Sequence, residues 1–314
     1  CLLEKGIDVC WVDLTKPFQM SQVEHVDGIM WSSGNAVDRQ IIYRNILSVE
    51  MCFGTPVFPD HRMLWHGSDK LSQYSLLKAA GAPMPATWVF WDKQEALNWA
   101  LQASYPKVFK LSSGGRCKDI YLVRSVEQAC HIINLMFGMG IYRGGKYSNP
   151  STTLARGWSQ LVDASRRGKH AALSIMGSVI KQPALESGYV YFQEYLPEND
   201  YKTCVTVSGD KAYSYLRFNG SDGFRSNGEK HDLAPESVDK RCIELAFELS
   251  DHMKLCYMAY DFLMDNGKPS VIEISPRFKK YQGYWAKDLT WCNADVSRVQ
   301  AEVEAFLWHI ARAR

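Results

Sequence analysis

Residues 260–275 read Tyr-Asp-Phe-Leu-Met-Asp-Asn-Gly-Lys-Pro-Ser-Val-Ile-Glu-Ile-Ser. The Asn266-Gly267 pair between two apolar runs is a strong signal for a tight β-hairpin. Asp261 and Glu273 then lie on adjacent strands, where an unpaired carboxylate is costly to bury. Two carboxylates, completed by phosphates and water, are a usual way to hold Mg²⁺ with a nucleotide. The alternative is that each carboxylate pairs with an arginine or lysine in the core, and the hairpin alone leaves both interpretations open.

Composition limits the fold and excludes several classes of function. With 314 residues, 46% of them hydrophobic, the chain is long enough for two or three domains. A formal net charge of +2 gives no support for nucleic-acid binding, and no apolar stretch of about 18 residues predicts a membrane span. The nine cysteines are odd in number and form no Cys-x-x-Cys pair. We therefore expect no disulfide framework and no cysteine metal site, and a reducing cytoplasm fits best.

The N-terminal region, residues 1–67, is predicted to be a small open α/β domain. The chain opens on Cys1 in the middle of a pattern, so we expect a first strand and most of its helix to lie upstream. Residues 1–6 are typical of a helix end that closes on glycine. The other elements expected here are strands at 7–14, 26–31 and 54–59 and a helix at 38–51.

Two α+β domains, residues 68–190 and 191–314, are predicted to follow. Their expected helices cover 68–80, with Ser68 as the N-cap, 93–103 and 238–253. Their expected strands cover 87–91, 107–111, 120–123, 189–196, 204–207, 212–218, 258–264 and 270–274. Residues 125–188 are the least regular part, and two helices are expected there, near 155–165 and 169–180.

A glycine-rich turn follows the strand that ends near Lys110, where residues 111–116 read Leu-Ser-Ser-Gly-Gly-Arg. A lysine at this place is able to reach nucleotide phosphates, while backbone N–H groups of the turn, including those of Ser113 and Gly114, cover them. The motif is not a Walker A loop, which requires Gly-x-x-x-x-Gly-Lys-Ser/Thr. A plain surface hairpin is the alternative interpretation.

A polar linker leaves a later strand, where residues 193–200 read Gln-Glu-Tyr-Leu-Pro-Glu-Asn-Asp. This linker is either an ordinary loop or a hinge whose backbone contacts adenine while a carboxylate holds the ribose hydroxyls. Arg217, Arg225 and Arg277 lie near strand ends or loops. The arginine fork is planar and always charged, which suits phosphate and carboxylate recognition. Taken singly, each arginine is also compatible with a surface position.

The order of these features resembles the ATP-grasp superfamily over nearly the whole chain. Residues 68–85 resemble the helix that opens that fold, 106–116 its phosphate-covering hairpin, 192–196 its adenine hinge and 261–277 its metal-binding hairpin. The resemblance implies the α+β ATP-grasp fold, with a truncated N-terminal open α/β domain followed by two α+β subdomains that grip ATP.

Shorter segments are similar to particular branches of the superfamily. Residues 199–202 and 224–227 are similar to the ribosomal protein S6 glutamate ligase and glutathione synthetase branch. Residues 189–194, 271–275 and 283–285 are similar to ATP-grasp proteins found with polysaccharide genes. The narrower match implies no settled substrate.

The resemblance implies a role for each matched residue. Lys70 and Lys110 would bind phosphates, which the turn at Ser113 and Gly114 would cover. Gln193, Glu194 and Leu196 would line the adenine site, Asp200 would hold the ribose, and Leu263 and Ile272 would pack on the adenine face. Asp261, Glu273 and Ser275 would hold Mg²⁺, and Arg217, Arg225 and Arg277 would face phosphate or the reacting carboxylate.

Two positions depart from the family pattern. Ser275 stands where asparagine is usual, and its hydroxyl is a shorter and weaker oxygen donor. Lys202 stands where arginine is usual, which removes bidentate geometry.

The function that the resemblance implies is an ADP-forming carboxylate–amine ligase that uses ATP and Mg²⁺ and passes through an acyl phosphate. Its substrates would be a small-molecule carboxylate and an amine, such as a sugar acid and an amino acid. Dimers are common in the family, so a homodimer is one assembly that the resemblance allows. The alternatives are a kinase that phosphorylates a hydroxyl and a nucleotide-binding protein without catalysis.

Overall fold

The computed structural model describes residues 2–16, 23, 25–32, 36–67, 69–113, 119–143, 185–225, 230–276 and 281–313. Its contacts divide the chain into two compact units. Unit 1 contains Cys1–Pro85 and Leu196–Arg314, and unit 2 contains Ala86–Tyr195. The mixed α/β architecture expected from the sequence is confirmed. The division into three domains at 1–67, 68–190 and 191–314 stays a prediction. The two contact units are a different grouping, in which the N-terminal segment belongs with the C-terminal one.

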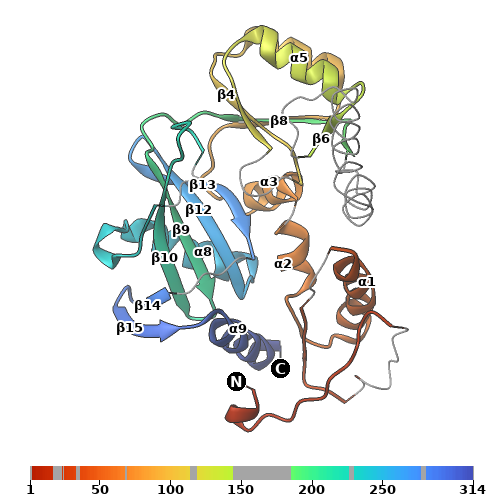
Figure 1. Cartoon of the computed structure of the whole chain (residues 1–314), viewed down its shortest axis with the longest axis vertical. Coiled ribbons are helices and arrows are strands. Elements are labelled where there is room, and N and C mark those ends of the chain that lie inside the picture. The colour runs from red at the N-terminus through yellow and green to blue at the C-terminus, as the bar shows by residue number, and fades with distance from the viewer. Residues whose placement is uncertain are drawn as a thin grey trace, which may run out of the picture. The chain divides into compact units, whose positions relative to one another are not determined.

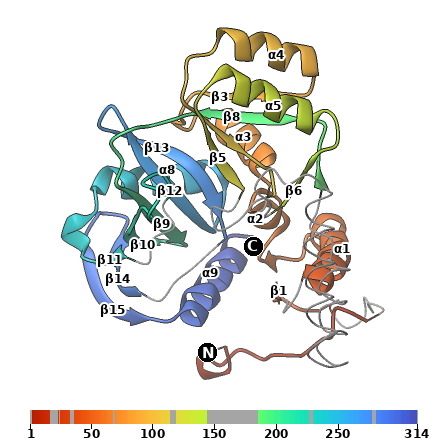
Figure 2. The same cartoon turned by 45° about the horizontal axis from the view of Figure 1, so that its top comes forward.

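The main sheet of unit 1 is antiparallel and has the order β13-β12-β9-β10-β14-β15 (Figure 1). A short strand, β11, pairs with β10 (Figure 2). The strands of this sheet are β9 (Tyr201–Ser208), β10 (Lys211–Phe218), β11 (His231–Asp232), β12 (Tyr257–Asp265), β13 (Lys268–Ser275), β14 (Tyr281–Ala286) and β15 (Trp291–Val296). The strand pair β12–β13 confirms the hairpin expected from Asn266-Gly267, and the pair β9–β10 contains the strands expected at 204–207 and 212–218. The β14–β15 hairpin was not predicted.

One face of this sheet is covered by the amphipathic helix α8 (Lys240–Met253). Its buried residues recur at helical spacing and include Ile243, Ala246 and Phe247. They form one core with inward-facing residues of β9, β10, β12 and β13, such as Val205 and Phe262. Burial of this shared apolar surface is the main force that holds the helix on the sheet.

The remaining elements of unit 1 are four helices, two 3₁₀ turns and a short parallel strand pair in the part of the chain that the structure describes. They are the 3₁₀ turns η1 (Leu3–Lys5) and η3 (Pro235–Ser237), helices α1 (Ala36–Phe53), α2 (His61–His66), α3 (Lys70–Ala79) and α9 (Arg298–Ala313), and the parallel pair β1 (Ile29–Met30) and β2 (Val57–Phe58). The strand predicted at residues 7–14 is wrong, because this segment pairs with no neighbouring strand and Trp11 is 93% exposed. β-Rich composition makes a strand only where a partner is present. Helix α9 was not predicted.

Unit 2 contains a four-stranded antiparallel sheet of order β3-β8-β4-β5. Its strands are β3 (Thr87–Phe90), β8 (Val190–Glu194), β4 (Lys107–Lys110) and β5 (Ile120–Val123). Helices α4 (Lys93–Gln102) and α5 (Val126–Met136) lie side by side on one face of the sheet (Figure 2). Trp99 of α4 packs against Trp88, Phe90 and Phe192 of the sheet.

A second, small sheet of unit 2 joins β6 (Ile141–Tyr142) to β7 (Leu185–Glu186). The helices predicted near 155–165 and 169–180 lie outside the described residues. In the part of the chain that the structure describes, no helix is both long enough and apolar enough to cross a membrane.

Candidate functional site

The hairpin of β12 and β13 brings the two acidic residues together. Asp261 and Glu273 are direct partners across the antiparallel pair. Asn266 and Gly267 form the turn, both with positive φ, 49° and 73°, which is the conformation that an Asn-Gly turn supplies. The side chains of Asp261 and Glu273 are 16% and 27% exposed, so both carboxylates remain within reach of a bound ligand.

A β-bulge in β13 decides which way Glu273 faces. The register pairs Asp261 with Glu273 and Phe262 with Val271, so Ile272 is the extra residue. Val271 and Ile274 are fully buried in the core under α8, whereas Ile272 and Glu273 are half-buried. In a regular strand, neighbouring residues face opposite sides. The bulge therefore lets the consecutive residues Ile272 and Glu273 both face away from that core. It was not predicted from the sequence.

Each carboxylate has a buried lysine beside it. The Lys202 ammonium contacts Asp261 Oδ2 directly, and Lys70 Nζ lies 3.9 Å from Glu273 Oε1. Lys202 and Lys70 are only 7% and 5% exposed. Pairing offsets part of the cost of burying these charges. The ion-pair interpretation of the hairpin is therefore realised in this structure, and a cation that binds here meets two lysines.

Helix α3 positions Lys70 at its first turn. The predicted cap at Ser68 is wrong by one residue, because the Asp69 carboxylate accepts two backbone N–H groups of that turn. One turn further on, Gln73 Oε1 accepts the Ile274 N–H at 3.2 Å. This bond fixes α3 against β13, and so holds Lys70 near Glu273.

A row of side chains crosses the sheet from Asp261. Cys204 of β9 is directly opposite Asp261, and Tyr215 of β10 is directly opposite Cys204. Burial raises the pKa of the Cys204 thiol, and the charge of Asp261 raises it further. Burial likewise raises the pKa of Tyr215. Both groups therefore stay protonated, and the Cys204 thiol supports Asp261 as a neutral hydrogen-bond partner.

Of the three predicted arginines, the structure places one beside this row. Arg217 of β10 is directly opposite Lys202, and its buried Nε has no hydrogen-bond partner among the described residues. Arg225 lies in the loop after β10, where its guanidinium is 3.4 Å from the Asp222 carboxylate. Arg277 lies outside the described residues. Ser275, two residues beyond Glu273 on β13, is half-buried.

Asn199 connects the linker to β12 in a way that was not predicted. Its side chain accepts the Met264 N–H at 2.8 Å and donates to the Met264 carbonyl at 3.0 Å. The linker residue Leu196 is buried, whereas Asp200 is exposed. The predicted adenine-face residue Leu263 lies next to this clamp and is half-buried. A polar residue in a Pro-Glu-Asn-Asp run is the only sequence signal for such a clamp.

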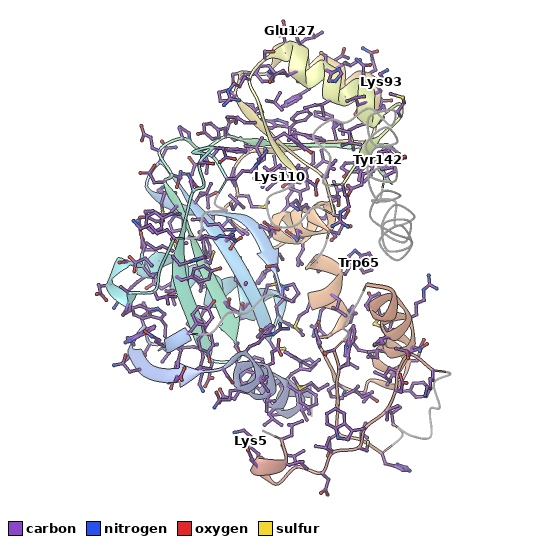
Figure 3. All side chains as sticks on the ribbon, viewed as in Figure 1. Lys5, Trp65, Lys93, Lys110, Glu127 and Tyr142 are labelled. Carbon is purple, nitrogen blue, oxygen red and sulfur yellow. The ribbon has the colours of Figure 1, made fainter. Side chains whose placement is uncertain are left out.

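In unit 2, the residues predicted to bind phosphate and adenine take part in two side-chain pairs. One joins a lysine to an amide, and the other joins a lysine to a carboxylate. Lys110, labelled on β4 in Figure 3, donates to Gln193 Oε1 at 2.6 Å. The other end of the Gln193 amide donates to Thr87 Oγ1 at 3.0 Å. Lys107, which was not predicted, holds both carboxylate oxygens of Glu194 at 2.9 and 2.8 Å. Two lysines of β4 thus bind side chains of β8, Lys110 that of Gln193 and Lys107 that of Glu194.

The start of the glycine-rich turn is tied to Glu186 of β7. The Glu186 carboxylate accepts the backbone N–H groups of Ser112 and Ser113 at 2.9 and 3.2 Å. It also accepts the hydroxyls of Ser113 and Tyr189. Consecutive backbone N–H groups that converge on an anion form a nest, so this turn already has the geometry of an anion site. Gly114 lies outside the described residues.

Comparison with known proteins identifies the fold. No protein-family model and no curated protein sequence matches the chain. Among solved structures, the biotin carboxylase domain of 2-oxoglutarate carboxylase from Hydrogenobacter thermophilus, in complex with MgADP, ADP and bicarbonate, matches with a TM-score of 0.50. It is 16% identical and covers 94% of this chain and 55% of its own.

Two further structures are similar at lower scores. N5-carboxyaminoimidazole ribonucleotide synthetase in its ADP complex has a TM-score of 0.48 at 15% identity, over 76% of this chain and 52% of its own. A RimK domain ATP-grasp protein from Sphaerobacter thermophilus has a TM-score of 0.45 at 13% identity, over 85% and 75%. The similarity to the biotin carboxylase domain shows that the chain has the ATP-grasp fold. The chain spans about half the length of the first two structures.

Proposed function

We propose that the chain is an ATP- and Mg²⁺-dependent ligase that forms an acyl phosphate from a substrate carboxylate and joins it to an amine. The observation that carries this proposal is the direct pairing of Asp261 with Glu273 on one hairpin, with Lys70 and Lys202 beside them. The ATP-grasp fold and solved relatives that include ADP complexes support it.

The residues present fit a magnesium ion that arrives with a nucleotide. Among the described residues, no group of three or more histidine, cysteine or carboxylate side chains is arranged to hold a metal ion. Mg²⁺ commonly takes one or two carboxylates and completes its shell with phosphates and water. Asp261 and Glu273 would hold the ion, with the Ser275 hydroxyl reaching it through water. The ion would supply charge neutralisation on the phosphates.

The other predicted residues divide the remaining work. Lys70 and Lys110 would neutralise phosphate charge, so that a carboxylate is able to approach the γ-phosphorus. Arg217 would stabilise the oxyanion that develops when the amine attacks the acyl phosphate. Its Nε has no hydrogen-bond partner among the described residues, which supports this role. The nucleoside would be held by Gln193, Glu194, Leu196, Asp200, Leu263 and Ile272.

The test is a screen for ADP release with amino acids against sugar acids, with mass spectrometry of the products. ADP with an amide supports the ligase, whereas ADP with a phosphate ester identifies a kinase. ATP binding without ADP release from any pair would identify a protein without catalysis.

The same assay tests the metal residues. We expect Glu273→Gln to abolish ATP turnover with every acceptor, because one of the two carboxylates is lost. Glu304→Gln is the matched control, since Glu304 pairs with Lys211 in the same unit, 2.7 Å away. Unchanged turnover in Glu273→Gln would rule out the proposed metal role.

A further inference from the structure

Two cations face each other beside the acidic pair. Lys202 and Arg217 are direct cross-strand partners on β9 and β10, so their side chains leave the same side of the sheet. Like charges at such positions destabilise a sheet unless an anion lies near both. Lys202 has Asp261, whereas Arg217 Nε has no hydrogen-bond partner in the described part of the chain. The pair therefore has room for one more negative group.

Asp261 cannot serve Lys202 and a divalent cation equally well. The Lys202 ammonium contacts Asp261 Oδ2, one of only two oxygens on that carboxylate. A metal ion on Asp261 would lie a few ångströms from the ammonium, where repulsion is strong because the surroundings exclude water. Lys202 is 7% exposed and Cys204, directly opposite Asp261, is 3% exposed. Solvent screening of this repulsion is therefore weak.

We propose that Lys202 is an exchangeable counterion. In the nucleotide-free protein it neutralises Asp261 and opposes metal binding. When the metal ion occupies Asp261, Lys202 binds a phosphate oxygen of the nucleotide together with Arg217. The metal therefore enters with the nucleotide and binds poorly before it. This inference rests on the proposed metal role of Asp261.

The test compares Lys202→Met with the wild type in two binding experiments that need no turnover. Methionine keeps much of the apolar stem of lysine and removes the charge. The first experiment titrates Mn²⁺ alone into metal-free, nucleotide-free protein and measures free Mn²⁺ by electron paramagnetic resonance. We expect Lys202→Met to bind Mn²⁺ at least ten-fold more tightly than the wild type. The second measures binding of a non-hydrolysable ATP analogue at saturating Mg²⁺ by calorimetry, where we expect the variant to bind at least ten-fold more weakly.

Lys211→Met is the matched control. Lys211 lies on β10 of the same sheet as Lys202 and also pairs with a carboxylate. That carboxylate is Glu304 of α9, which is not part of the acidic hairpin. We expect this variant to change neither affinity. Lys202→Gln, which keeps a hydrogen-bond donor for Asp261, replaces Lys202→Met if thermal unfolding shows that the methionine variant does not fold.

The outcomes separate this inference from the proposed function. Mn²⁺ binding that is unchanged or weaker in the folded Lys202 variant overturns the inference, and so does unchanged binding of the ATP analogue at saturating Mg²⁺. Asp261→Asn tests the metal site itself, by Mn²⁺ binding in the presence of ATP. If Asp261→Asn has no effect on that binding, the proposed metal role fails. If Asp261→Asn abolishes Mn²⁺ binding in the presence of ATP, while Lys202→Met fails to tighten the binding of Mn²⁺ alone, only the inference fails.

Discussion

At the scale of single residues, Asn199 has the clearest structural role outside the acidic pair. Both ends of its amide bond the backbone of Met264, three residues after Asp261. A side chain that satisfies a donor and an acceptor of one strand residue acts as an added strand partner. It therefore fixes the linker to the strand that carries Asp261.

We expect Asn199→Ala to lower the free energy of unfolding by about 2 kcal/mol, because two backbone groups lose their partners. Urea denaturation followed by tryptophan fluorescence measures this change. Asn98→Ala is the control, since Asn98 only pairs with Gln94 on the exposed side of α4, and its effect is expected to stay within about 0.5 kcal/mol. Equal effects of the two substitutions would contradict the clamp.

At the scale of elements, the bulge in β13 separates the core side of the strand from the side that carries Glu273. It places Ile274 in the core with no exposure and leaves Ile272 half-buried on the other side. A shift of one residue moves every side chain of a strand to the opposite face. The bulge thus allows an apolar core and a charged surface to share one short strand.

We expect Ile274→Ala to destabilise the protein by about 3 kcal/mol, because it leaves a cavity in the core. Ile272→Ala removes the same atoms from the same strand, two residues away, and is expected to cost about 1 kcal/mol or less. Urea denaturation of the two variants side by side measures the difference. A larger loss for Ile272→Ala would mean that the register of the bulge is wrong.

At the scale of the whole molecule, the chain forms unit 1 from two separate segments and unit 2 from the continuous stretch between them. Unit 2 has its own sheet, its own helices and an aromatic core around Trp99. With about 110 residues, it lies within the usual size range of independent domains.

We therefore expect residues 86–195, expressed alone, to fold and to melt in one cooperative transition. Circular dichroism in the far ultraviolet, recorded against temperature, measures this. Trp99→Ala within the same fragment is expected to abolish the transition or lower its midpoint, since it removes the ring that joins α4 to the sheet. A gradual melt of the unchanged fragment would show that unit 2 depends on unit 1.

The sequence predicted the elements whose signals are local. The Asn266-Gly267 turn, the strands at 204–207 and 212–218 and the helix at 238–253 are each encoded within one short segment, and each is confirmed. The segment at 7–14 has strand composition but no partner, and pairing depends on residues elsewhere in the chain.

The sequence alone therefore placed Asp261 and Glu273 on adjacent strands of one hairpin, because the Asn-Gly turn joins those strands. The turn register by itself leads to a pairing of Asp261 with Ile272, and the bulge shifts that pairing to Glu273. Only the tertiary structure decided what surrounds them. Lys202 is 59 residues from Asp261, and Gln73, which holds α3 and Lys70 in place, is 201 residues from Ile274. Such contacts arise from the packing of whole elements, and a bulge of one residue at Ile272 determines which charges meet.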